Sequence, residues 1–333
     1  MKPVVLVQAD SLQPFVRCLV RRGINPEPYL ERQRIAPKQV TSGKGVILRS
    51  QAYGFFKDVS RRESMPTLGF LDHDPFTIDD LGSLGGLLEQ AATLKDAIDT
   101  FAALIHSFVQ ANTVYLEQGP EISWLCIRGE GMDPEAHAGD HFTPFVLAEI
   151  IRLAAGPQWR PEGLRFQFGP AEMMQRSAFS GDIECHHFRH GSGVAFRSEL
   201  LASPLQKRAK RAQGGEPPSA PAPLPLESTS EVLEVFVASH LKHGTPPSSD
   251  EAADLLNIHR STLSRALRSE GLTWRRLVDR ARLGQARQRL TQTTESVKEI
   301  AYSLGYTEPG NFIRAFKRLT GSTPEAFRRD SSE

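Results

Sequence analysis

The last third of the chain contains one short helical pattern twice, and this repeat limits what the region can fold into. The first copy starts at Glu251 and the second at Glu299. Matching residues of the two copies lie 48 positions apart and have identical or small side chains: Ala253 and Ala301, Leu256 and Leu304, Asn257 and Gly305. Self-similarity of this kind indicates a duplicated supersecondary unit.

Each copy has the pattern of a helix-turn-helix. The alanine lies mid-helix, where a second helix has to approach closely, and the turn residue, Asn257 or Gly305, tolerates a left-handed backbone. The second helix of each copy carries two apolar residues four positions apart, Leu263 with Leu267 and Phe312 with Phe316. We expect these side chains to face the core. Cap residues and a proline mark the expected helix starts: Ser248 or Ser249, Ser296 and Pro309.

Residues 230–329 resemble the DNA-binding domain of AraC/XylS-type bacterial transcription regulators. The resemblance is most specific over residues 297–328, which read VKEIAYSLGYTEPGNFIRAFKRLTGSTPEAFR. It implies an all-α domain of seven helices, in which one long helix holds two helix-turn-helix units apart. Here that helix would extend from Trp274 to about Gln292.

The resemblance also implies which side chains meet DNA. Base contacts are expected from outward positions of the two reading helices: Ser261, Thr262, Ser264 and Arg265 in the first, and Gly310, Asn311, Ile313 and Arg314 in the second. Each of the two arginines can make a bidentate contact with guanine, with phosphate binding as the alternative, and Asn311 can pair with adenine. The DNA backbone is expected to meet Arg268, Arg275, Arg276, Lys317 and Arg318.

The positive charge of the chain is concentrated in the repeat region. The net charge of +1 divides into +3 after residue 230 and −2 before it. Nine arginines and two acids lie between Arg260 and Arg289. A solvated helix face normally mixes Glu with Arg, whereas a stripe this basic favours a surface that faces a polyanion.

Length and composition allow two domains with hydrophobic cores, since 39% of the 333 residues are apolar. No apolar run is long enough for a membrane span, and the first ten residues lack the layout of a signal peptide. The three cysteines, Cys18, Cys126 and Cys185, are odd in number and widely spaced. This usage is typical of reduced thiols, so we expect a cytoplasmic protein without membrane contact.

The first two hundred residues predict an α+β domain, because helical and strand-like apolar patterns are mixed along the sequence. Helices are expected at residues 10–22, 47–60, 93–110 and 140–155. Thr93 and Asp96 have the spacing of a capping box at the start of the third helix. Strands are expected at residues 113–118, 121–128, 164–168, 186–189 and 193–197.

This region is similar to the N-terminal domain called arabinose-binding in one AraC/XylS subgroup. The similarity rests on four short segments, at residues 80–85, 93–97, 156–161 and 193–205, whereas residues 31–76 depart from the pattern. In that subgroup the domain senses a small molecule, forms a homodimer, or does both. We expect the helices at 93–110 and 140–155, with the strands at 113–128, to enclose the effector pocket.

The composition changes sharply between the two regions. Five prolines lie among the ten residues 216–225, which follow the basic cluster at 207–211, so no apolar periodicity is left and a linker is predicted. We therefore predict an N-terminal domain at 1–206, a linker at 207–228 and a DNA-binding domain at 229–333, which should fold alone.

Several groupings invite a chemical interpretation that their spacing does not support. The histidines at 137 and 141, and those near Cys185, lack the paired spacing of a structural zinc site. No phosphate-binding loop or catalytic triad signature is present. The sequence thus predicts no metal, cofactor or catalytic residue, and we expect the cysteines to be buried thiols.

Taken together, these patterns predict a sequence-specific transcription regulator that binds double-stranded DNA and senses a small-molecule effector. Activation and contact with RNA polymerase are implied by the resemblance alone. Two alternatives stay open at this point: an enzyme tethered to DNA by its C-terminal domain, and a regulator controlled by a protein partner instead of a ligand.

Overall fold

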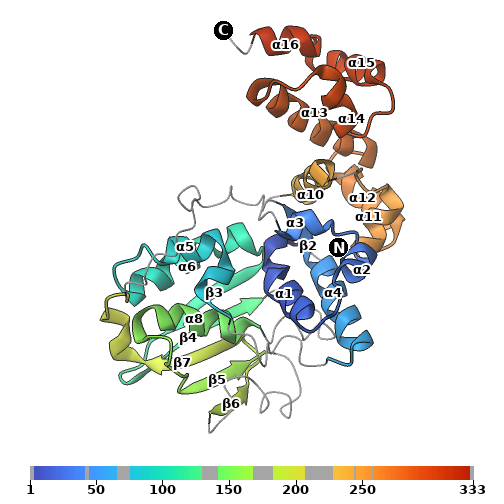
Figure 1. Cartoon of the computed structure of the whole chain (residues 1–333). Coiled ribbons are helices and arrows are strands. Elements are labelled where there is room, and N and C mark those ends of the chain that lie inside the picture. Colours follow the sequence, from blue (N-terminus) through green and yellow to red (C-terminus); the bar gives the residue numbers. More distant parts are fainter. Residues whose placement is uncertain are drawn as a thin grey trace. The chain divides into compact units, whose positions relative to one another are not determined.

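The computed structural model describes residues 4–41, 45–65, 76–129, 142–167, 183–206, 228–243, 245–256 and 258–330 (Figure 1). The chain divides into two compact units. The helical unit consists of Met1–Leu6, Val46–Ser50 and Pro225–Glu333, and the sheet unit of Val7–Gly45 and Gln51–Leu224. The predicted linker lies outside the described residues except for Ser228. None of the described helices is long and apolar enough to cross a bilayer.

A five-stranded sheet forms the centre of the sheet unit, with the order β3-β4-β7-β5-β6. All neighbours are antiparallel except β5 and β6, which are parallel. At the middle of the sheet, Gly193 lies beside Cys126, and a Cβ at Gly193 would come within 2.6 Å of the Cys126 Sγ. The strands are β3 (Asn112–Glu117), β4 (Ile122–Gly129), β5 (Gly163–Phe166), β6 (Glu184–His187) and β7 (Ser192–Arg197).

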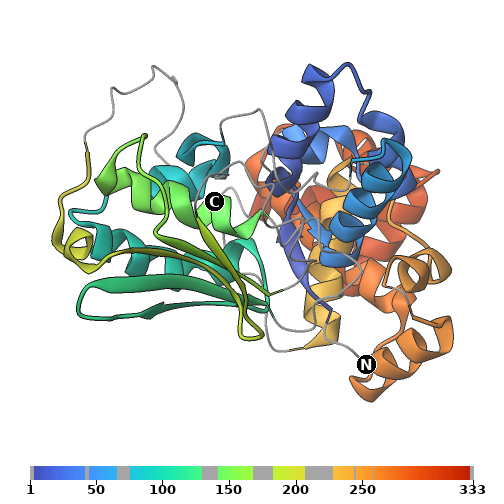
Figure 2. The same cartoon turned by 90° about the horizontal axis from the view of Figure 1, so that it is seen from below.

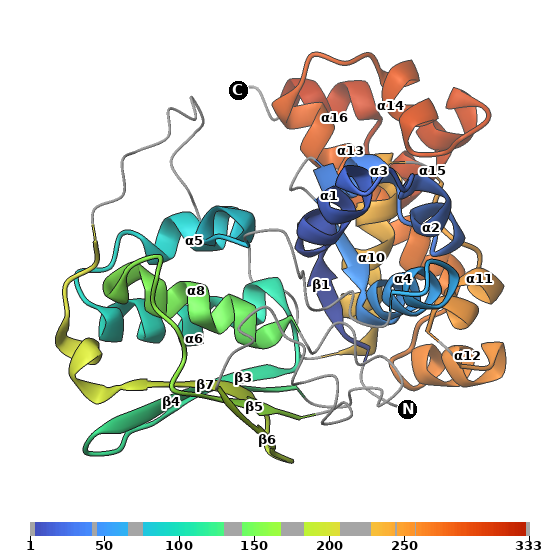
Figure 3. The ribbon, with the colours of Figure 1, turned by 60° about the horizontal axis from the view of Figure 1, so that its bottom comes forward.

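Two helices, α6 (Leu94–Phe108) and α8 (Thr143–Ala155), pack on one face of this sheet (Figures 2 and 3). Their apolar stripes, which include Phe101 and Ile150, are buried together with the inward-facing Leu125 and Val194 of the strands. The sheet unit also contains α1 (Gln13–Arg21), α2 (Glu27–Arg32), α3 (Pro37–Thr41), most of α4 (Arg49–Arg62) and α5 (Ser83–Leu88), besides the 3₁₀ turns Ala9–Leu12, Ile78–Leu81 and Ser198–Ala202.

The predicted capping box at the start of α6 is confirmed. The Thr93 hydroxyl accepts a hydrogen bond from the Asp96 amide, and the Asp96 carboxylate accepts one from the Thr93 amide at 3.1 Å. The mixed α+β character of this region is likewise confirmed. The prediction of a helix over 47–60 was wrong at its start, because Val46–Leu48 form the strand β2 and α4 begins only at Arg49.

The opposite face of the sheet carries polar and aromatic side chains. The Arg165 guanidinium lies 3.9 Å from the centre of the Trp124 ring and 4.4 Å from that of Phe188. It also pairs with the Glu117 carboxylate at 2.5 Å. These contacts join side chains of β3, β4 and β5 with Phe188, which follows β6. Because the Arg165 guanidinium is already stacked and paired, it leaves little charge for a ligand.

In the part of the helical unit that the structure describes, the residues after 228 form seven helices, as the resemblance implied (Figure 1). Capping boxes start α11 at Ser248, with Glu251, and α14 at Ser296, with Glu299. Gly305 ends the first helix of the second repeat with a φ of 79°, whereas Asn257 lies outside the described residues. The helices are α10 (Thr229–His243), α11 (Ser249–Leu255), α12 (Arg260–Ser269), α13 (Trp274–Gln292), α14 (Val297–Ser303), α15 (Pro309–Thr320) and α16 (Pro324–Asp330).

A short segment from early in the sequence completes the core of the helical unit. β2 (Val46–Leu48) is fully buried and packs against α10, and it pairs with β1 (Leu6–Gln8). The Val46 amide donates a hydrogen bond of 3.0 Å to the buried Ser239 hydroxyl, and the Ser50 hydroxyl donates to the Leu255 carbonyl. The domain limits at 206 and 229 stay a prediction. The helical unit also contains Met1–Leu6 and Val46–Ser50, which precede both limits.

Removal of the Ser239 hydroxyl should therefore destabilise the helical unit. Ser239→Ala leaves the buried Val46 amide without its acceptor, which costs about 1–3 kcal/mol of unfolding free energy. Ser269→Ala is the matched control, since the Ser269 hydroxyl is exposed, and it should change stability by less than about 0.5 kcal/mol. Urea unfolding of the full-length chain measures both. Equal effects of the two changes would mean that β2 is not anchored at Ser239.

The carboxylate of Glu270, which follows α12, caps the N-terminus of α10. The Glu270 carboxylate accepts hydrogen bonds from the Thr229 amide at 3.2 Å and the Ser230 amide at 3.0 Å. Partial burial acts to raise the pKa of Glu270, but the hydrogen bonds from Ser230 and Thr229 outweigh it and hold the pKa below its usual value. The ionised carboxylate therefore stabilises the fold above its unfolded-state pKa, and this stabilisation is lost as the pH falls through the lowered value.

Glu270→Gln should accordingly lower stability near neutral pH by up to about 1 kcal/mol, the typical contribution of a helix cap. The difference from the unchanged protein should shrink as the pH falls toward the range in which the carboxylate of Glu270 takes up its proton. Unfolding curves at a series of pH values measure this. Glu308→Gln is the control, because Glu308 is an exposed N-cap residue whose side chain makes no capping hydrogen bond. A difference between Glu270→Gln and the unchanged chain that does not depend on pH would contradict the charged cap.

Candidate nucleic-acid interface

The first reading helix, α12, is divided into a buried and an exposed side. Leu263 and Leu267 are each 1% exposed, which confirms their predicted place in the core. Among the expected base contacts, Ser261 and Arg265 are exposed, whereas Thr262 and Ser264 are half-buried. Of these four expected contacts, Arg265 thus presents a long cation to solvent and Ser261 a hydroxyl.

The second reading helix, α15, has the same division but a different chemistry. Phe312 and Phe316 are buried, with ring centres 5.7 Å apart. Gly310, Asn311 and Arg314 are exposed, together with Lys317 and Arg318. Ile313 is half-buried and packs against the core cluster that contains Leu290 and Ile300, so only part of its side chain is available for DNA.

Cations in this region differ in whether they have a carboxylate partner. Among the described residues, ion pairs join Arg260 with Asp250, Arg280 with Glu234, Arg289 with Glu295, Arg318 with Asp279 and Arg329 with Asp330. Within the described residues, no carboxylate lies within 4.0 Å of the cationic groups of Arg265, Arg268, Arg275, Arg276 and Lys317. These five residues are all exposed and all belong to the predicted DNA-contact set.

A groove of about 670 Å³ lies between the start of α13 and the face of α15. Its charged lining consists of four arginines and one acid: Arg275, Arg282, Arg314, Arg318 and Asp279. Trp274 also lines it and donates from its indole nitrogen to the Pro247 carbonyl at 3.2 Å. The excess of cations gives this groove the sign that a phosphate backbone requires.

Arg282 and Tyr306 form the fixed wall of this groove. The Arg282 guanidinium lies 4.7 Å from the centre of the Tyr306 ring and donates to the Leu304 carbonyl at 3.0 Å. Burial raises the pKa of the Tyr306 phenol, although Arg282 opposes this rise, so the hydroxyl keeps its proton and can donate. Sequence reasoning did not include either residue, because they are far apart in the sequence and become neighbours only when α13 packs beside α14.

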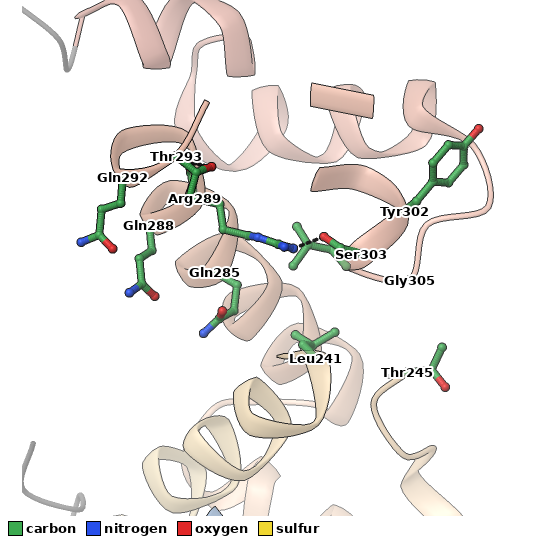
Figure 4. Close-up of a pocket in the computed structure, with 11 residues that line it drawn as sticks. Leu241, Thr245, Gln285, Gln288, Arg289, Gln292, Thr293, Tyr302, Ser303 and Gly305 are labelled. Atoms are coloured by element: carbon green, nitrogen blue, oxygen red, sulfur yellow. Dashed lines mark hydrogen bonds between the residues drawn. The ribbon is translucent and has the colours of Figure 1, made fainter. Parts of the chain in front are cut away.

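A second groove of about 630 Å³ lies further along α13 and has a different lining (Figure 4). Glutamine, threonine and tyrosine side chains predominate there, including Gln285, Gln288 and Tyr302. Its one arginine, Arg289, points to the Ser303 hydroxyl (Figure 4) and pairs with Glu295 at 3.0 Å. Because that cation is neutralised, this groove lacks the charge that distinguishes the first one.

The other sequence candidates do not form a second site in the described residues. His137 and His141 lie outside those residues, and no group of three or more His, Cys, Asp or Glu that could hold a metal occurs within them. Cys18 and Cys126 are buried, as expected, and Cys185 is partly buried. Burial raises the pKa of Cys126 to about 11 and also raises that of Cys185, so both thiols stay protonated near neutral pH.

Comparisons with known proteins agree with this geometry. The family described as "Arabinose-binding domain of AraC transcription regulator, N-term" matches residues 23–205, and the family described as "Helix-turn-helix domain" matches residues 252–330. The HTH-type transcriptional regulator VirS of Mycobacterium tuberculosis is 26% identical to this chain, and the match covers 97% of this chain and 96% of VirS.

One further sequence match and one solved structure show the extent of similarity to other proteins. The ornithine utilization regulator of Pseudomonas aeruginosa is 38% identical over 85 residues, which cover 26% of this chain and 25% of that protein. The crystal structure of the transcriptional regulator CdpR from Pseudomonas aeruginosa covers 91% of this chain and 96% of its own, with 20% identity and a TM-score of 0.35. The family assignment rests on the sequence matches, which cover both the reading helices and the N-terminal region: the chain belongs to the AraC family of transcription regulators that have an N-terminal domain of the arabinose-binding type.

Proposed function

We propose that α12 and α15 enter successive major grooves on one face of duplex DNA and that this binding controls transcription. The observation that carries this proposal is the row of exposed cations without carboxylate partners along α12, the start of α13 and α15. α13 separates the two reading helices and spans roughly 28 Å for its 19 residues. Successive major grooves on one face of DNA are about 34 Å apart, so the proposal requires α12 and α15 to present their exposed sides at about that separation.

The proposed base contacts come from the outward positions of the reading helices. On α12 they are Ser261, Thr262, Ser264 and Arg265, and on α15 they are Gly310, Asn311, Ile313 and Arg314. Exposure favours Arg265 and Arg314 as the main readers, since a guanidinium matches the two acceptors of guanine. Ile313 offers only part of its side chain, which suits contact with a thymine methyl.

The proposed phosphate contacts are Arg268, Arg275, Arg276, Lys317 and Arg318. Four of them are exposed and lack a carboxylate partner among the described residues. Arg318 pairs with Asp279 at 3.5 Å, so it has to leave or share that partner when it binds a phosphate. This competition makes Arg318 the weakest of the five proposed contacts.

The remaining partners are also proposals. The N-terminal region would bind a small-molecule effector, because its match is to the arabinose-binding type of domain. The protein would act in the cytoplasm as an activator that contacts RNA polymerase. Its working form would be a homodimer. We propose no enzymatic role, since the relatives that match are transcription regulators.

Two classes of substitution should separate base reading from phosphate binding. Arg265→Ala and Arg314→Ala should each cost about 1–3 kcal/mol of binding free energy and relax the preference at one base pair, with the two base pairs about one turn apart. Arg276→Ala and Lys317→Ala should weaken binding to all sequences alike and lower the salt slope by about one. Binding of the full-length protein to a library of duplexes at two salt concentrations measures both effects.

Uniform weakening by Arg265→Ala and Arg314→Ala, with unchanged base preference, would show that both arginines bind phosphate. Arg329→Ala serves as the control, because Arg329 is exposed but belongs to α16 and pairs with Asp330. It should leave affinity and salt slope unchanged.

An effector should be detectable through thermal unfolding of the full-length protein. A metabolite at about one hundred times its dissociation constant raises the unfolding free energy by about 2.7 kcal/mol, because it binds only the folded state. The Arg314→Ala variant is the control. A true effector should raise its melting temperature as much as that of the unchanged protein, whereas a nucleotide bound at the DNA interface should not. If no metabolite of the library shifts the melting temperature and a pull-down returns a stoichiometric protein, the regulator is controlled by a protein partner and not by a small molecule.

A further inference from the structure

Arg314 and Asn311 form a pair on the exposed side of α15, before any DNA is bound. The Arg314 Nη2 donates a hydrogen bond of 2.5 Å to the Asn311 Oδ1, one helical turn earlier. Both residues are exposed and both line the positively charged groove beside α13. The contact therefore lies within the proposed reading surface.

The chemistry of the two side chains fixes their roles in this contact. A guanidinium has only donors, so the asparagine has to present its carbonyl oxygen and turn its amide nitrogen away. A hydrogen bond with a charged donor is about twice as strong as a neutral one. Asn311 can pair bidentately with adenine only if this same oxygen accepts from the adenine amino group. Arg314 thus occupies one of the two lone pairs of the Asn311 Oδ1 and directs this oxygen toward the guanidinium, which opposes the orientation that adenine requires.

The guanidinium of Arg314 lies back over the first turn of α15. A Cβ built on Gly310 would lie 3.7 Å from the Arg314 Nη1, which is an ordinary van der Waals distance. This direction is the usual one for long side chains on a helix.

We infer that Asn311 is a positioning residue for Arg314 and not a reader of adenine. This inference rests on the proposed function, and within it a positioning role replaces the base contact proposed for Asn311. Residues 311 and 314 then act together on one base pair. Held in place before binding, the guanidinium loses less rotamer freedom on contact with guanine.

Selection from a randomised duplex library with the full-length protein tests this assignment. The unchanged protein should select a guanine opposite the start of α15. Arg314→Ala should lower that guanine preference about 5- to 150-fold, as expected for one bidentate contact. Asn311→Ala should lower the preference at the same base pair, by roughly 3- to 10-fold, as expected for one hydrogen bond at a solvent-exposed site. The double variant should lose no more than Arg314→Ala alone, because the two residues act as a unit.

Two internal controls accompany the selection. The preference at the base pair assigned to Arg265 should stay unchanged in Asn311→Ala, and the melting temperature should stay unchanged because Asn311 is exposed. Loss of an adenine preference at a separate base pair, with the guanine preference intact, would overturn the inference. Unchanged preferences at every base pair would overturn it as well. Failure of the proposed function is distinguishable, because the unchanged protein would then select no sequence at all.

Discussion

The packing of α13 determines whether the two reading helices can act together. One stripe of this helix buries Leu277 and Ala281 in its first half, and Ala286 and Leu290 in its second. α10 packs along it, and α14 and α16 pack near its end. The small alanines allow neighbouring helices to approach closely, while the leucines fill the space between them. The helix thus packs directly against α14 of the second helix-turn-helix unit, whereas the first unit reaches it through α10, which contacts both α12 and α13.

Charge then distinguishes the surfaces that this scaffold exposes. Arg280 and Arg289 belong to the same helix as Arg275 and Arg276, yet carboxylates neutralise the first two. The groove at the start of α13 consequently keeps a positive charge, and the groove further along it does not. Counting arginines in the sequence located the basic region, but the ion pairs decide which part of that region can attract a polyanion.

Local patterns were sufficient to predict the helices of the DNA-binding region. The repeat and its similarity to a known family placed α13 at its observed ends, and apolar spacing identified Leu263 and Phe312 as core residues. Prediction was wrong where a distant partner decides the structure. Ile47 was assigned to a helix because nothing near it in the sequence indicates the strand that packs against α10. The strand order of the sheet likewise depends on packing that no local pattern encodes.

The buried strand β2 has a consequence for how the protein is made. Val46 and its partner Ser239 are 193 positions apart, so the ribosome completes the strand long before the helix that covers it. At typical elongation rates of about 5–20 residues per second, this delay is roughly 10–40 s. During that time three consecutive apolar side chains, Val46, Ile47 and Leu48, lack their final neighbours. The DNA-binding unit therefore reaches its final packing only after α10 has been synthesised, although one of its buried segments is made early.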